Sequence, residues 1–165
     1  MSLFWNLSHG LLAGATGTAA LNALTYADMA KRGRPASELP IKMAATFASM
    51  LDLSEFSKPA AERSEKDTNR LTGLGALLGY ANGFGVGAFL GMVRPSIRQL
   101  PCFWVGLLLA GVTLAASEGT ASALGQTDPR EWSASDWLED IVPRCIYGWT
   151  TCIAYDEFHR NLNSP

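Results

Sequence analysis

Long uncharged stretches alternate with short polar segments along this chain, and four of the stretches are long enough to form membrane-spanning helices. We place the predicted spans at about 4–29, 71–93, 102–124 and 137–155. Each is close to the roughly 20 residues that a helix needs to cross the hydrocarbon core of a bilayer. The pattern therefore predicts an all-α protein, an integral membrane four-helix bundle that forms a single membrane domain over residues 1–165.

The second stretch, from Leu71 to Val93, contains no charged residue and has a glycine at every fourth position. An interior glycine costs a soluble helix about 0.5–1 kcal/mol relative to alanine, whereas in lipid a row of glycines lets a neighbouring helix approach closely. Gly10 and Gly14 repeat this spacing in the first stretch, which makes that stretch the expected partner. We therefore predict glycine-zipper packing through these two residues and through Gly75, Gly79, Gly83, Gly87 and Gly91.

Other interpretations of these stretches fit the sequence less well. The segment GLGALLG is similar to part of a dinucleotide-binding loop, but that loop follows an apolar strand, and here the charged segment 63–70 precedes it. A signal peptide would begin with positive charge, which residues 1–6 lack. In the last stretch only residues 145–155 are free of charge, so a three-span protein with that segment on the membrane surface is the alternative.

The polar connection from Lys31 to Arg70 holds eight of the thirteen basic residues, Lys58 among them. By the positive-inside rule we expect this connection to lie in the cytoplasm. Within it, apolar residues recur at helical spacing from Ile41 to Leu51, and Ser37 is placed to cap the resulting helix. The sequence therefore predicts a helical cytoplasmic loop that lies on the membrane surface or the end of the bundle, with docking on a partner as the alternative.

Two ionisable residues are predicted to lie within the membrane. Glu118 lies six residues before the end of the third span, and Arg144 lies seven residues after the start of the fourth. At 1.5 Å per residue both are about 9–11 Å from the same membrane face, and Asn22 in the first span lies at a similar depth. We expect an intramembrane ion pair between Glu118 and Arg144, with Asn22, Thr113 or Ser117 as hydrogen-bond partners. Such a pair either locks two helices together or forms a proton or substrate site.

Composition narrows the function classes further. The net charge of −2 and the clustering of the basic residues in one loop give no reason to expect a nucleic-acid partner. Cys102, Cys145 and Cys152 have no CxxC spacing, and we interpret them as small core residues, with a disulfide or a metal site as the alternative. His9 and His159 lie near opposite ends of the chain, away from any recognised catalytic spacing. We therefore expect no catalytic residues, no metal site and no cofactor.

Several motifs are similar to a family of small bacterial membrane proteins without an assigned role, and more distantly to the YagU-type inner-membrane proteins. They are GLLAGATGTAALNALTY in the first span, RGRPAS after it, NRLTGLGALLG at the start of the second span, and DIVPRCIYGWTT in the fourth. The resemblance implies a multi-pass protein of the bacterial plasma membrane, but its motifs concern packing and imply no chemistry. Such a family would place a histidine after Pro143, where this chain has Arg144.

These observations favour a non-enzymatic integral membrane protein that acts through helix packing, by self-association or as an accessory subunit. Its expected partners are the lipid bilayer and either a second copy of the chain or another membrane protein. The alternative is a small transporter or channel for protons, cations or another solute that uses the intramembrane Glu118.

Overall fold

A computed structural model of the chain describes residues 3–53 and 60–161, and within these ranges every regular element is helical. The helices are α1 (Leu3–Arg32), α2 (Leu39–Met50), α3 (Glu65–Val93), α4 (Cys102–Leu114), α5 (Thr120–Ala123) and α6 (Ala134–Asn161). Short 3₁₀ segments are η1 (Ala60–Glu62), η2 (Arg94–Ile97) and η4 (Pro129–Glu131), and η3 (Ala115–Gly119) is a π-helical turn between α4 and α5. The prediction of an all-α chain is confirmed for the described residues.

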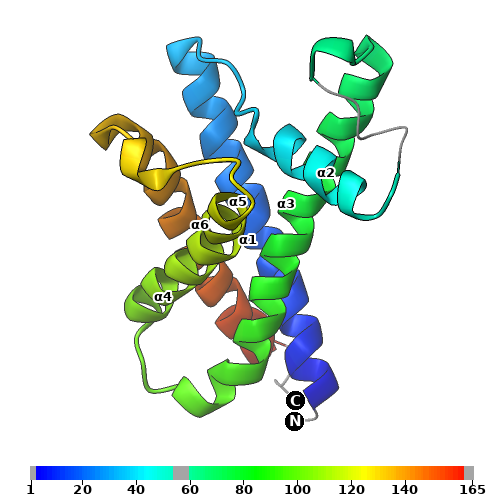
Figure 1. The fold of residues 1–165 in the computed structure, drawn as a ribbon. Helices are drawn as coiled ribbons and strands as arrows, with labels where there is room; N and C mark the ends of the chain where they lie inside the picture. Colours follow the sequence, from blue (N-terminus) through cyan, green and yellow to red (C-terminus); the bar gives the residue numbers. More distant parts are fainter. Residues whose placement is uncertain (1–2, 54–59, 162–165) are drawn as a thin grey trace.

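The long helices cross one another in a bundle whose two ends differ (Figure 1). At one end, called here the α2 end, lie α2 and the segments that join α1 to α2 and α5 to α6. At the other, called here the Arg94 end, lie the start of α1, η2, the start of α4 and the end of α6. Lys58 in the predicted cytoplasmic loop lies outside the described residues.

Serine hydroxyls accept backbone N–H groups at the starts of α2, α3 and α6. At the start of α3, Ser64 Oγ accepts the N–H of Asp67 at 3.2 Å, and Asp67 Oδ2 accepts the N–H of Ser64 at 3.2 Å. This reciprocal capping box satisfies donors that a helix leaves unpaired in its first turn. At the start of α2, Ser37 Oγ accepts the N–H of Leu39 at 3.2 Å. The apolar face of α2 then packs on the first turns of α3, through the buried residues Ala44, Ala45 and Leu71.

Glycines bring α1 and α3 into backbone contact along an antiparallel crossing. A Cβ atom on Gly87 would overlap with the backbone of Gly10 and Gly14, and one on Gly91 would overlap with the carbonyl of Asn6. A Cβ on Gly83 would meet the hydroxyl of Thr18. No larger residue fits at these positions without moving one of the helices, so the interface requires glycine.

Two members of the predicted glycine row do not contact α1. Gly75 packs on Pro40 of α2, and a Cβ on Gly79 would meet no atom within 4 Å. The predicted packing role therefore fails at Gly79, and Gly75 packs on α2 instead of α1. A row with a spacing of four residues rotates around a helix of 3.6 residues per turn, so its two ends face different neighbours.

The second helix pair, α4 and α6, packs through Gly106 and Gly148, where an added Cβ would overlap with the facing chain. Tyr147 connects this pair to the first, because its hydroxyl donates a hydrogen bond to the carbonyl of Gly83 at 2.6 Å. The buried core that joins the four long helices consists of Ala13, Val86, Leu90, Val105, Leu109, Tyr147, Cys152 and Tyr155.

Large apolar side chains cover the outside of the bundle, while polar side chains of α1 lie inside it. Phe4 and Leu12 are 70% and 54% exposed, whereas His9 and Thr18 are 2% and 6% exposed. A water-soluble helix usually shows the opposite distribution, with its apolar stripe turned inward.

Two helical segments among the described residues, Glu65–Ile97 and Cys102–Ala123, are long and apolar enough to cross a membrane. Only 28% and 33% of their most apolar windows is buried inside the bundle. The sequence predicted four such segments, whereas by length and composition α1 and α6 do not meet this criterion. Glycines, threonines and Asn22 lower the hydropathy of α1, and charged residues such as Glu139 and Arg144 interrupt α6.

Candidate functional site

The most deeply buried acidic side chain of the described residues is Glu118, which projects from the π-helical turn η3 and is 6% exposed. A π-helical turn inserts an extra residue into an α-helix, and such turns are frequent at functional sites. Here the turn separates α4 from α5. The helix α4 packs on α6, and Glu118, within the turn, is also directed toward α6.

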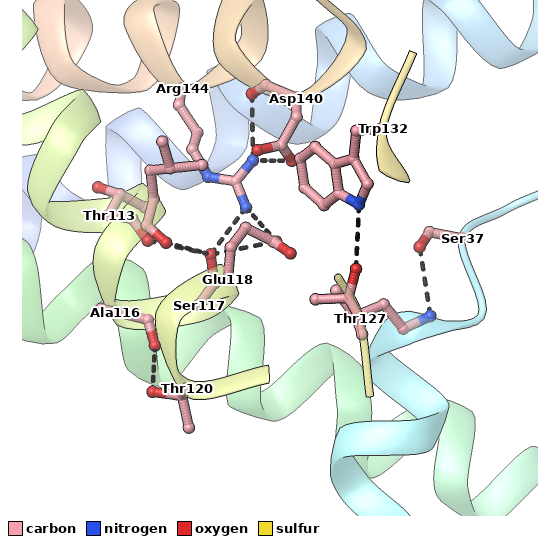
Figure 2. Close-up of polar contacts among 12 residues, drawn as sticks. Ser37, Thr113, Ala116, Ser117, Glu118, Thr120, Thr127, Trp132, Asp140 and Arg144 are labelled. Carbon is pink, nitrogen blue, oxygen red and sulfur yellow. Dashed lines mark hydrogen bonds and ion pairs between the residues drawn. The ribbon is translucent and has the colours of Figure 1, made fainter. Parts of the chain in front are cut away.

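Arg144 of α6 lies between the polar groups of two helices (Figure 2). Its Nη2 donates to Glu118 Oε1 at 2.8 Å and to Ser117 Oγ at 2.7 Å. Its Nη1 donates to the backbone carbonyl of Asp140 at 3.1 Å and forms an ion pair with the Asp140 carboxylate. We call Glu118, Asp140 and Arg144 the buried triad.

Of the three residues predicted as hydrogen-bond partners of the Glu118–Arg144 pair, only Ser117 contacts the pair with its side chain. Ser117 contacts both Glu118 and Arg144, and Thr113 contributes only its carbonyl, which accepts the Ser117 hydroxyl at 3.0 Å. Asn22 forms no hydrogen bond with Glu118 or Arg144.

The sequence analysis did not identify Asp140 of α6 as a partner of Arg144. Its spacing of four residues from Arg144 could have revealed the pair, since side chains at i and i+4 lie on the same face of a helix.

The buried triad carries one net negative charge when all three groups are ionised. Glu118 Oε2 and Asp140 Oδ2 are buried and have no hydrogen-bond partner among the described residues. A neighbouring group at the α2 end is balanced, because Arg32 and Arg34 pair with Glu139 and Asp28. A buried carboxylate oxygen without a partner is costly, so the triad is a site that gains stability from a proton or a cation.

An open groove of about 360 Å³ runs along the outer side of Glu118. Figure 2 shows that one Glu118 oxygen faces Arg144, while the other points toward the side on which Trp132 and Thr127 lie. The walls are small or aromatic residues, among them Gly111, Ala115, Gly119, Trp132 and Trp137. Glu118 therefore lines a groove that opens at the surface of the bundle.

A second charged cluster lies at the Arg94 end. Arg94 is 4% exposed and donates from Nε and Nη2 to the two carboxylate oxygens of Asp156, at 2.9 and 2.5 Å. Its Nη1 donates to the carbonyls of Ile97 and Leu100, at 3.3 and 3.0 Å. All of these contacts hold η2 and the start of α4 against the end of α6.

Cys102 and Cys152 form a disulfide beside this cluster, with Cα atoms 5.7 Å apart. Cys152 lies in the buried core and Cys102 packs against it, as interpreted, and the two also form a disulfide, which was the alternative. Cys145 is free and partly buried. The sequence separation of 50 concealed the pairing, which depends on the antiparallel packing of α4 on α6. The two sulfurs and an Asp156 oxygen lie within 4.8 Å of one another, but the disulfide and Arg94 already occupy these metal-type ligand atoms.

No protein-family model, no curated protein and no solved structure matches this chain. The resemblance to the YagU-type proteins stays a prediction, and the function has to be argued from the geometry of the two clusters and the groove.

Proposed function

We propose that this chain is a non-enzymatic membrane protein whose four long helices, α1, α3, α4 to α5 and α6, cross the bacterial plasma membrane as one packed unit. The distribution of side chains supports this placement. Polar side chains of α1 and α6, among them His9, Thr18 and Thr151, are buried against neighbouring helices, while large apolar residues face outward. A helix with polar groups paired inside a bundle inserts more readily than its composition alone indicates.

The proposed orientation places the α2 end in the cytoplasm. Basic residues gather in the connection at that end, in agreement with the positive-inside rule. The Cys102–Cys152 disulfide is at the opposite end, and disulfides persist on the oxidising, external side of a membrane. In a Cys145→Ser background, a membrane-impermeant maleimide added to whole cells should label Ser96→Cys and leave Glu62→Cys unlabelled. The reverse labelling would overturn the orientation.

The main observation in favour of the packing role is the ion pair between Glu118, in the turn between α4 and α5, and Arg144 of α6. In this role the triad locks the helices in register, and the assembled bundle acts through self-association or as a subunit of another membrane protein. Arg144→Met would leave the carboxylates of Glu118 and Asp140 without their shared cation, whereas Glu118→Gln, Asp140→Asn and Arg144→Met together remove all three charges. If the role is packing, the triple variant regains most of the melting temperature that Arg144→Met loses.

The oligomeric state of the protein tests the same proposal, because association would use the outer surface of the bundle. Crosslinking in native membranes should trap the chain with a second copy or with another membrane protein. A protein that stays monomeric and uncrosslinked would contradict a role through association.

The excess negative charge of the triad favours a second candidate function, uptake of a proton or cation during transport. Flux into liposomes that contain the wild type should then disappear in the triple variant, although that variant stays folded. If wild-type protein gives no proton or cation flux, the transport function is wrong and the packing role stands.

A further inference from the structure

We propose that the groove beside Glu118 binds a protonated primary amine that carries a small apolar body. The inference rests on the second candidate function, cation uptake at the triad, and names the class of cation. It joins three observations that the helix-lock role leaves unused: the free carboxylate oxygen, the excess charge and the shape of the groove.

The free oxygen of Glu118 determines the charged end of the ligand. Glu118 is more than nine-tenths buried, and its Oε2 has no partner among the described residues although the side chain lines the groove. A carboxylate oxygen in such a place needs an N–H or O–H donor. A protonated amine supplies the donor together with the positive charge that the triad lacks.

The remaining walls determine the other end of the ligand. Gly111, Leu114, Ala115 and Gly119 form an apolar floor, and Trp132 and Trp137 stand close together with ring centroids 5.0 Å apart. The indole N–H of Trp132 already donates to Thr127 Oγ1 at 3.1 Å, so its ring is held in place. Aromatic rings attract organic cations and pack on apolar groups, and a volume of about 360 Å³ is in the range of small-molecule sites.

The donor set fits an amine better than a metal ion. Calcium takes six to eight oxygen ligands and magnesium takes an octahedron of oxygens. The groove offers the Glu118 carboxylate and the Ser122 side chain among mainly apolar walls. A single ionic contact beside an apolar surface is the arrangement that an alkylammonium or arylalkylammonium ion requires.

The test uses phenethylamine as the probe and 2-phenylethanol, of similar shape but without charge, as its control. Calorimetric titration of the detergent-purified protein should show binding of the amine and at least about tenfold weaker binding of the alcohol. The N-trimethyl derivative of phenethylamine keeps the charge but has no N–H donor, so it should also bind more weakly. Equal binding of all three compounds would overturn the proposal.

Two matched variants test the location. Gly119→Leu places a side chain in the groove, and Gly85→Leu places the same side chain on the lipid-facing side of α3. Neither added Cβ meets another atom within 4 Å, so both proteins should fold. Gly119→Leu should abolish amine binding, and Gly85→Leu should leave it unchanged. Loss of binding in both variants, or in neither, would overturn the site.

Glu118→Gln tests the charge directly and should weaken amine binding by about tenfold or more. Unchanged affinity would overturn the role of Glu118, provided that circular dichroism shows a folded protein. If liposome flux of protons or inorganic cations depends on the triad while no amine binds, the transport function survives and this inference fails.

The amine has two natural sources, a soluble metabolite and the headgroup of phosphatidylethanolamine. Nanodiscs of phosphatidylcholine alone, and nanodiscs in which half of the lipid is phosphatidylethanolamine, separate these sources. Weaker phenethylamine binding in the second set would identify the lipid headgroup as the competing amine. Equal binding in both sets would identify a soluble amine.

Discussion

Two arginines, the buried Arg94 and the partly buried Arg144, form ion pairs near opposite ends of this bundle, and they differ in how completely their surroundings match them. Arg94 faces one carboxylate, Asp156, in a bidentate pair, and its Nη1 donates to two backbone carbonyls. Arg144 faces two carboxylates, and each of them keeps one buried oxygen without a partner among the described residues. Both arginines form salt bridges, but only the Arg94 cluster contains equal numbers of positive and negative charges.

The difference separates a structural contact from a candidate site. A balanced and fully hydrogen-bonded pair has nothing left to bind, so the Arg94 cluster is explained by the elements that it connects. An unbalanced triad beside an open groove retains binding capacity for a proton or a cation. Charge counted over a cluster is therefore more informative here than the presence of any single ion pair.

The largest expected effect compares the two arginines directly. Arg144→Met leaves the Glu118 and Asp140 carboxylates buried and uncompensated, and we expect a loss of stability on the order of 3–5 kcal/mol. Arg94→Met leaves the Asp156 carboxylate without its arginine, but this side chain is 37% exposed and remains hydrated. The loss of stability in Arg94→Met should therefore be smaller than in Arg144→Met. Melting temperatures in detergent measure both. A larger loss for Arg94→Met would contradict the assignment of the excess charge to the triad.

The disulfide provides the next test, because it reinforces only the Arg94 end. Replacing both Cys102 and Cys152 by serine should lower stability by about 2–4 kcal/mol. The matched control, Cys145→Ser, removes the free cysteine and should have little effect. Phenethylamine binding should be unchanged in both variants, since the groove lies elsewhere. Three reactive thiols in the natively purified protein would show that the disulfide does not form.

The crossing of α1 and α3 connects the two ends, and its glycines give a prediction of intermediate size. In Gly83→Leu the new side chain overlaps with Thr18, and overpacking of this kind costs about 1–3 kcal/mol or more. Gly79→Leu on the same helix meets no atom within 4 Å at its Cβ and should be nearly silent. Thermal unfolding in detergent compares the two. Equal losses would show that the packing face of α3 is misassigned.

Parts of this architecture could be predicted from the sequence because they depend on local pattern. The absence of charge from Leu71 to Val93 predicts a long helix, and counting residues along two helices places Glu118 and Arg144 at one depth. The pairing of Cys102 with Cys152 depends on which helices are neighbours. The sequence spacing does not contain that information.

Two further features could not be predicted from the sequence either, because they depend on which helices and loops are neighbours. Gly79 belongs to the sequence row but not to the contact, since α1 crosses α3 only from Gly83 onward. The groove consists of residues from the third stretch, from the loop that contains Trp132 and from the start of α6, and it exists only when that loop folds back on α5.

The smallest expected effect is a difference in how the two ends respond to acid. At the Arg94 end, burial and the nearby charges of Arg98 and His9 hold the pKa of His159 below its ordinary 6.5. At the α2 end, hydrogen bonds from the hydroxyl and the N–H of Ser133 hold the pKa of Asp136 below its ordinary 3.8. In both cases the unfolded chain binds protons more readily than the folded one, so stability falls as pH decreases from the ordinary pKa through the lowered one.

Acidification should therefore loosen the Arg94 end before the α2 end. Between about pH 7 and pH 5, His159→Gln should lose less melting temperature than the wild type, while Asp136→Asn should follow the wild type. Below about pH 4, the melting temperature of the Asp136→Asn protein should fall less with decreasing pH than that of the wild type. Melting curves of the three proteins at matched ionic strength measure these slopes. If His159→Gln keeps the full wild-type slope above pH 5, another group titrates there, and the two ends do not differ in the way proposed.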